Sequence, residues 1–198
     1  KYENPFGDHR ISALVGYSWL NSESSGFSAS NSEFSTNAYL YNNLANGTYL
    51  KDGKAGVGSW KNSSRLIGFF GRISYGYADR YNVLVSLRHE GSSKIGADHK
   101  WGNFPGVSAG WTISNEEWME GTRSWLDNLK LRASFGITGV IPGSSYMSLL
   151  RYDYDTSYGN FVDASGKWSP SLTPISNANP DLRWEKSTEY NIGLDMGF

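Results

Sequence analysis

Residues 69–90 read FFGRISYGYADRYNVLVSLRHE and contain two runs in which apolar and polar side chains alternate. In the second run, Tyr81, Val83 and Val85 alternate with residues that include the polar Asn82 and Ser86. Successive side chains of a β-strand point to opposite faces, so this period of two predicts strands. A short connection of this kind joins antiparallel strands. The stretch therefore predicts a β-hairpin with one apolar and one polar face.

The same alternation recurs along most of the chain. Six segments show it, at about 9–19, 65–77, 81–90, 104–113, 128–138 and 182–198. Each meets or exceeds the roughly 9–11 residues that a tilted strand needs to cross a membrane. The charged residues of the polar faces are Arg10, Arg72, Arg88, Glu90, Lys130, Arg132, Arg183, Glu185 and Glu189. We expect them to line a solvated wall with ion pairs between strands.

The composition favours strands and turns and excludes several classes of function. The 198 residues include 23 glycines, 15% aromatic and only 19% charged residues. The net charge of -1 argues against nucleic acid as a partner, because phosphate binding needs a basic surface. No cysteine is present, which excludes disulfides and thiolate chemistry. No apolar run approaches the roughly 20 residues of a membrane helix, so the chain either crosses a membrane as strands or is soluble.

The connections between the six segments alternate in length. Long connections are expected at about 20–64, 91–103 and 139–181, and short ones at 78–80 and about 114–127. If the strands alternate in direction, all long connections lie at one end and all short ones at the other. Outer-membrane barrels show this asymmetry, with long extracellular loops and short periplasmic turns. Within the second short connection, residues 114–118 are predicted to form a capped helical turn.

Aromatic side chains on the apolar faces fall at two levels. One level, near the short connections, comprises Tyr75, Tyr77, Tyr81, Trp111 and Phe198, and the other comprises Trp19 and Trp184. Aromatic girdles at both membrane interfaces have this arrangement. Alternation alone also fits a soluble β-sandwich that binds carbohydrate at a cell surface, or a small complete barrel with a structural role. The loop asymmetry and the two aromatic levels favour a membrane barrel wall.

Four stretches resemble the SusC/RagA class of TonB-dependent outer-membrane transporters of Bacteroidetes. They are residues 69–75 continuing to Asp79-Arg80-Tyr81, residues 91–94 followed by 101–105 and 107–111, residues 129–136, and residues 179–186 ending in 191–195. Their joint order makes the resemblance specific, although no single stretch would. Two positions depart from the family pattern: Glu90 stands where Asp is usual, and Val140 where Asn is frequent. Neither departure affects the expected fold.

The resemblance implies an all-β fold, an antiparallel transmembrane β-barrel segment with about six strands of a roughly 22-stranded barrel. Residues 1–198 would form a partial barrel domain, because six strands cannot close such a barrel. The family's N-terminal plug and TonB-contact segment are not recognised here, so we expect a piece of the middle-to-late barrel. The whole protein would import glycans or peptides across the cell outer membrane, with a SusD-like surface lipoprotein, TonB and outer-membrane lipids as partners.

No motif in the chain predicts catalysis, a cofactor or a metal site. Residues 106–110 match the GxSxG pattern of hydrolases, but that motif needs a strand-to-helix turn and here lies inside an alternating segment. His9, His89 and His99 lack metal-ligand spacing, and Asp153 with Asp155 lacks the glycine and glutamate of a calcium loop. We therefore expect a protein that is not an enzyme.

Aromatic residues in the long connections are the weak candidates for substrate binding. Trp60, Tyr152, Tyr154 and Trp168 could stack on a sugar ring or a peptide. The alternative, which the sequence favours, is that they pack within the loops or against a partner protein.

Overall fold

The computed structural model describes residues 2–38, 40–122, 124–155 and 161–198, and the side chains of residues 3–6 and 155 lie outside this description. The chain divides into two compact units. Unit 1 comprises Lys1–Leu20 and Arg65–Phe198, and unit 2 comprises Asn21–Ser64. The two units are described separately below.

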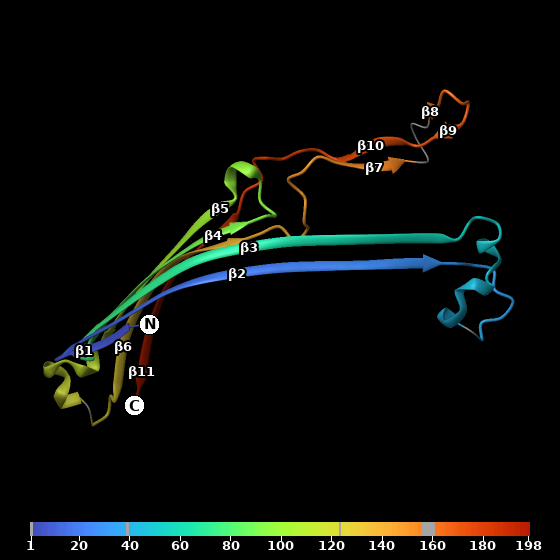
Figure 1. Ribbon diagram of the computed structural model, residues 1–198. Coiled ribbons are helices and arrows are strands. Elements are labelled where there is room, and N and C mark those ends of the chain that lie inside the picture. Colours follow the sequence, from blue (N-terminus) through green and yellow to red (C-terminus); the bar gives the residue numbers. More distant parts are fainter. Residues whose placement is uncertain (1, 39, 123, 156–160) are drawn as a thin grey trace. The chain divides into compact units, whose positions relative to one another are not determined.

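Unit 1 is built on a seven-stranded sheet in the order β1-β2-β3-β4-β5-β6-β11 (Figure 1). The strands are β1 (Tyr2–Phe6), β2 (His9–Ser30), β3 (Gly56–Tyr77), β4 (Tyr81–Ser92), β5 (Trp101–Thr112), β6 (Asn128–Val140) and β11 (Glu185–Gly197). Neighbouring strands from β3 to β11 pair antiparallel. The six predicted segments are thus found as strands. The short strand β1 was not predicted, because its sequence lacks alternation and contains Pro5, a residue that sheets accept at their edges.

The register places all apolar faces on one side of the sheet. Val85 lies between Ile73 on β3 and Val107 on β5, and Phe135 on β6 lies next to Tyr190 on β11. Phe135 is half-buried, but the other four side chains are exposed, and Ile192 retains 81% of its accessible surface. A soluble β-sandwich would bury this face against a second sheet, so the exposed apolar face argues against that alternative.

A small apolar core lies where the long connections of unit 1 meet. Ile95, Phe104 and Trp184 are buried together, and Ile95 is only 1% exposed. Trp184 was expected in the second aromatic level of the apolar face, and that expectation is wrong. It precedes the first residue of β11, Glu185, so the strand ladder does not hold it on that face.

The connections of unit 1 contain short elements. The turn η3 (Ala97–His99) joins β4 to β5, and the 3-10 turns η4 (Ile113–Asn115) and η5 (Glu117–Thr122) join β5 to β6. The predicted helical turn at 114–118 is therefore split into two, and Thr112 provides no side-chain cap for η4. Between β6 and β11 lie two ribbons, β7 (Arg151–Asp155) with β10 (Ser171–Ser176), and β8 (Phe161–Val162) with β9 (Trp168–Ser169).

Unit 2 lies within the first expected loop but is partly strand. β2 continues to Ser30 and β3 begins at Gly56, beyond the boundaries expected at 19 and 65. The sequence hides these extensions because Ser and Gly occupy both faces, which removes the alternation. Between the strands lie the 3-10 turns η1 (Leu40–Asn46) and η2 (Thr48–Leu50). The side chain of Asn31 holds them by donating to Leu44 O at 2.7 Å and accepting from Leu50 N at 3.1 Å. In the part of the chain that the structure describes, no helix is long and apolar enough to cross a membrane.

Candidate functional site

The polar face of the unit 1 sheet is the candidate site. Its centre, on β4, β5 and β6, is lined by small side chains, because Ser86 lies beside Gly106 and Ser108 lies beside Ser134. A shallow hollow opens over this floor, and Lys130 and Arg132 line one side of it. The short side chains leave room above the sheet, so the face forms a wide polar surface rather than a packed core.

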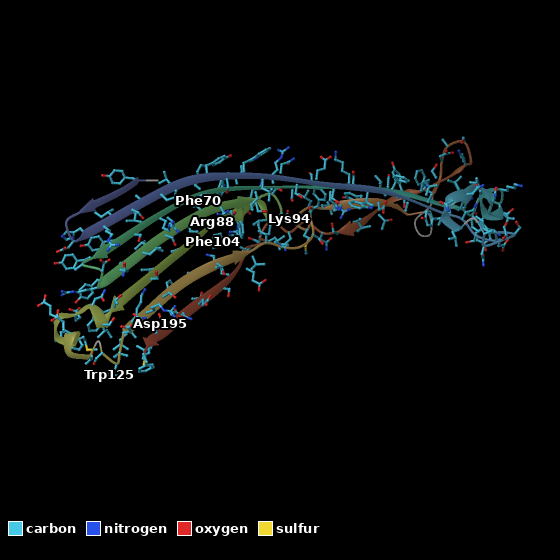
Figure 2. The ribbon with its side chains drawn as sticks, turned by 90° about the horizontal axis from the view of Figure 1, so that it is seen from below. Phe70, Arg88, Lys94, Phe104, Trp125 and Asp195 are labelled. Carbon is cyan, nitrogen blue, oxygen red and sulfur yellow. The ribbon has the colours of Figure 1, made fainter. Side chains whose placement is uncertain are left out.

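Arg88 stands on this face between two aromatic rings. Phe70 on β3 and Phe104 on β5 are its partners on the two neighbouring strands (Figure 2). Its guanidinium lies 5.7 Å from the centre of the Phe70 ring and donates to Glu90 Oε1 at 2.6 Å. The Phe70 ring in turn lies against Gly16 of β2, where a Cβ atom would collide with it. The cation is thereby held in one place by an ion pair and a cation–π contact.

A second charged pair lies further along the face. Arg132 on β6 donates from Nε and Nη2 to the two carboxylate oxygens of Asp195 on β11, at 2.7 Å each. This bidentate geometry is favourable for guanidinium and carboxylate. It is an ion pair between neighbouring strands of the kind that the sequence predicts, although both side chains remain open to solvent.

Two aromatic rows border the apolar face. The row at the short-connection end runs Tyr77, Tyr81, Trp111, with ring centres 6.4 and 6.3 Å apart. The other row contains Tyr17, Phe69, His89 and Trp101, and His89 stacks on Trp101 with centres 4.7 Å apart.

The distance between the two rows is close to the height of the apolar band of an outer-membrane barrel. Phe69 and Tyr77 are eight residues apart on β3, as are Tyr81 and His89 on β4. Eight residues of strand span about 27 Å, which a tilt of about 40° reduces to about 21 Å. That is close to the apolar band of about 25 Å in outer-membrane barrels.

Glu116 connects the short-connection end to the first of these rows. Its carboxylate accepts hydrogen bonds from Tyr81 Oη at 2.6 Å, Trp111 Nε1 at 2.9 Å and Arg80 Nη1 at 3.2 Å. The hydrogen bond from Tyr81, followed by that from Trp111, lowers the pKa of Glu116 below its ordinary value. We call these four residues the Glu116 cluster. No sequence motif identifies it, because its members come from a turn, two strand ends and the bend between η4 and η5.

The opposite end of unit 1 is joined by hydrogen bonds that loop carbonyls accept from backbone and side-chain donors. Gly96 N donates to Leu182 O at 2.9 Å, and Trp184 Nε1 donates to Lys100 O at 3.1 Å. Lys94 Nζ donates to the carbonyls of Pro142 and Gly143 at 3.3 and 2.7 Å. With Ile95 and Phe104, these contacts form what we call the loop clamp. It unites the connections after β4 and β6 with the segment that leads into β11.

The four aromatic candidates are exposed, and three of them belong to unit 1. Tyr152 and Tyr154 share a face of β7, whereas Trp168 lies on β9 opposite Val162. Trp60 belongs to unit 2, where its indole covers Gly26. Whether any of them binds a substrate stays a prediction.

The GxSxG match and two of the histidines lie on strands and connections of unit 1. Ser108 of the GxSxG match lies within β5, between Leu84 and Ser134, with no strand-to-helix turn. His89 contacts Asn103, and His99 contacts Asp181. Within the described residues, no group of three His, Cys, Asp or Glu side chains could hold a metal ion. The side chain of Asp155 lies outside the described residues.

Comparison with known proteins yields consistent matches. A family model described as "TonB dependent receptor-like, beta-barrel" matches residues 2–198. TonB-dependent receptor P3 of Formosa agariphila is 30% identical over 195 residues, which are 98% of this chain and 18% of that protein. TonB-dependent receptor SusC of Bacteroides thetaiotaomicron is 36% identical over 134 residues, which are 67% of this chain and 13% of that protein.

A solved structure is similar over nearly the whole chain. It is the RagAB peptide importer in the closed-closed state, with a TM-score of 0.79 and 25% sequence identity. The match covers 99% of this chain and 20% of that one. This chain therefore spans a fifth or less of the length of these three similar proteins.

Proposed function

This chain belongs to the TonB-dependent receptor-like β-barrel family, and we propose that it forms part of the wall of an outer-membrane nutrient transporter. The family is one of outer-membrane receptors rather than enzymes, which confirms the expectation of a non-catalytic protein. The similarity to SusC and to the RagAB importer confirms the resemblance drawn from the sequence motifs. The β-barrel assignment is confirmed over the β-sandwich alternative.

The two-faced sheet is the observation that carries this proposal. One face presents exposed Val, Ile and Leu side chains between two aromatic rows. The other presents small polar side chains with the fixed charges of Arg88 and Arg132. Lipid contact suits the first face, and a hydrated passage suits the second. The long connections about 20–64, 91–103 and 139–181 would then lie outside the cell.

The whole transporter would import a glycan or a peptide with energy supplied through TonB. A SusD-like surface lipoprotein would cover the long connections, as the similarity to SusC supports. RagAB is itself a peptide importer. Trp60, Tyr152, Tyr154 and Trp168 are the proposed ring-stacking contacts of this chain, because they are exposed on ribbons of the long connections.

Adjacent residues on opposite faces provide a direct test of the wall. In the intact transporter, Val85→Cys and Ser86→Cys place a thiol on the apolar and the polar face of the same strand. A membrane-impermeant maleimide should label the Ser86→Cys variant at least about ten times faster. Equal labelling of the two variants in intact outer membranes would refute the membrane wall.

Uptake by a strain that lacks the transporter tests the substrate class. Loss of growth on oligopeptides, with growth on glycans unchanged, would assign a peptide, and the reverse would assign a glycan. Import should also stop when the gene for TonB is deleted. Unchanged growth on every oligomeric nutrient, or uptake that persists without TonB, would refute active import.

A further inference from the structure

The connection between β5 and β6 contacts the apolar face at the end of the sheet. Glu116 in this connection accepts hydrogen bonds from Tyr81 and Trp111, whose side chains belong to the apolar face. Asn115 donates to the carbonyl of Asp79 at 2.9 Å, which joins the connection to the neighbouring short turn as well. The chain after β5 therefore folds towards the apolar face.

Glu116 also replaces water or lipid headgroups as the hydrogen-bond partner of Tyr81 and Trp111 in the aromatic row. Tyr and Trp at a membrane interface usually direct their polar edge to water or headgroups. Here a carboxylate of the protein occupies that place, and its side chain is only 9% exposed. The connection itself is thus located at the level where headgroups would meet the row.

Two large aromatic side chains of this connection point outward. Trp118 and Trp125 are 66% and 59% exposed, whereas Met119 and Leu126 beside them are buried. Figure 2 shows Trp125 at the end of the sheet, among the 3-10 turns. Buried Met119 and Leu126 anchor the connection, and the two indoles remain available to a partner. Indoles favour the interfacial zone of a bilayer.

The charge of the connection indicates which lipids suit it. Residues 113–127 contain four acidic residues, Glu116, Glu117, Glu120 and Asp127, and one arginine. An acidic segment is repelled by anionic headgroups and attracted by headgroups that carry an ammonium group. Glu120 is placed for such a contact, because it is exposed to solvent.

We propose that residues 113–122 and 124–127 form an interfacial foot that rests on zwitterionic, amine-bearing headgroups at the short-connection end of the barrel, with Trp118 and Trp125 inserted beside them. Glu116 is its positioning residue, since it joins the foot to the aromatic row. The inference rests on the proposed function, because it requires that the apolar face contacts lipid.

Environment-sensitive labels test the foot in the intact transporter, made free of other cysteines and reconstituted in phosphatidylethanolamine vesicles. Labels are attached to cysteines introduced at Trp118 and Trp125, at Ser134 on the polar face, and at Val85 on the apolar face. The labels at 118 and 125 should be quenched by lipids brominated near the headgroup and protected from iodide at least about threefold relative to Ser134. Iodide quenching equal to that at Ser134 would overturn the foot.

The label at Val85 distinguishes failure of the interfacial foot from failure of the proposed membrane wall. Quenching there by deeply brominated lipid shows that the wall contacts lipid whatever the foot does. Without that quenching, the membrane wall itself fails.

Matched glutamate variants test the role of Glu116. With the label at 125, Glu116→Gln should raise iodide quenching at least about twofold, because the amide cannot satisfy all three donors. Glu117→Gln should not, since Glu117 contacts only Arg80 among the described residues. Equal effects of the two variants would overturn the positioning role. Replacing phosphatidylethanolamine with phosphatidylglycerol should weaken protection at 118 and 125, and unchanged protection would overturn the assigned headgroup chemistry.

Discussion

The two ends of the unit 1 sheet are held together by opposite means. At the end of the long connections, the loop clamp buries Ile95, Phe104 and Trp184. At the end of the short connections, the Glu116 cluster relies on one carboxylate that accepts three hydrogen bonds. The first is held by apolar burial and close backbone contact, and the second by charge and hydrogen-bond geometry.

Because of this difference, the two ends should lose stability under different changes. Apolar burial depends on volume, so the loop clamp should respond to changes of side-chain size and hardly to pH. A carboxylate with a lowered pKa is sensitive to acid, so the Glu116 cluster should respond to pH and to loss of charge. The following predictions, on the intact transporter in lipid vesicles, test that contrast from the largest effect to the smallest.

Trp184→Ala should give the largest loss of stability. Truncating a buried tryptophan leaves a cavity and typically costs about 3–5 kcal/mol. It also removes one of the two hydrogen bonds that Lys100 O accepts, and only the one from Ser92 N remains. Urea unfolding measures the loss, and Trp168→Ala is the control because Trp168 is exposed. Similar values for both variants would show that the loop clamp contributes no more than an exposed ribbon.

Gly96→Ala should give the second largest loss of stability. A Cβ atom at Gly96 would collide with the backbone carbonyl of Pro180, which cannot move without disturbing the loop clamp. Overpacking of this kind typically costs about 1–3 kcal/mol. Gly136→Ala is the control, because a Cβ atom there meets open space. If Gly96→Ala unfolds at the same urea concentration as the wild type, the close approach is not needed.

Glu116→Gln should lower the thermal unfolding midpoint at neutral pH by more than Glu117→Gln does. The neutral amide presents one acceptor and one donor group, so at least one of Tyr81, Trp111 and Arg80 loses its partner. Gel migration with and without heating measures the midpoint. A larger effect of Glu117→Gln would invert the proposed roles of the two glutamates.

Acid should weaken the Glu116 cluster and leave the loop clamp unchanged. Because the pKa of Glu116 is lowered in the folded state, its contribution is complete above about pH 4.5, the ordinary glutamate value. The contribution is lost as the pH falls below that value through the lowered pKa. The difference in midpoint between wild type and Glu116→Gln should therefore shrink from pH 6 to pH 3. The difference between wild type and Trp184→Ala should stay constant over that range.

Arg132→Gln should have the smallest effect. The Arg132–Asp195 pair is bidentate but solvent-exposed, and such pairs contribute little net stability. The unfolding midpoint should stay close to the wild-type value at moderate salt. A loss as large as that of Gly96→Ala would mean that the polar face is held together by its charges.

Local patterns in the sequence predicted most of the sheet but little of the site. The alternation of Tyr81, Val83 and Val85 identifies a two-faced strand without knowledge of its neighbours. The same rule misplaced Trp184, since alternation continues along the sequence after the chain has left the sheet. It also missed the strand extensions at 20–30 and 56–64, where no buried face imposes a pattern.

By itself, the sequence determined the two faces of the wall and the family, because side-chain alternation and short motifs are local properties of the chain. Only the tertiary structure decided which groups meet across the strands. Phe70, Arg88 and Phe104 lie in one row because the register of three strands places them there. Glu116 reaches donors from three segments because the connection after β5 folds towards the apolar face. Such contacts depend on register and loop path, which many sequences with the same alternation could satisfy differently.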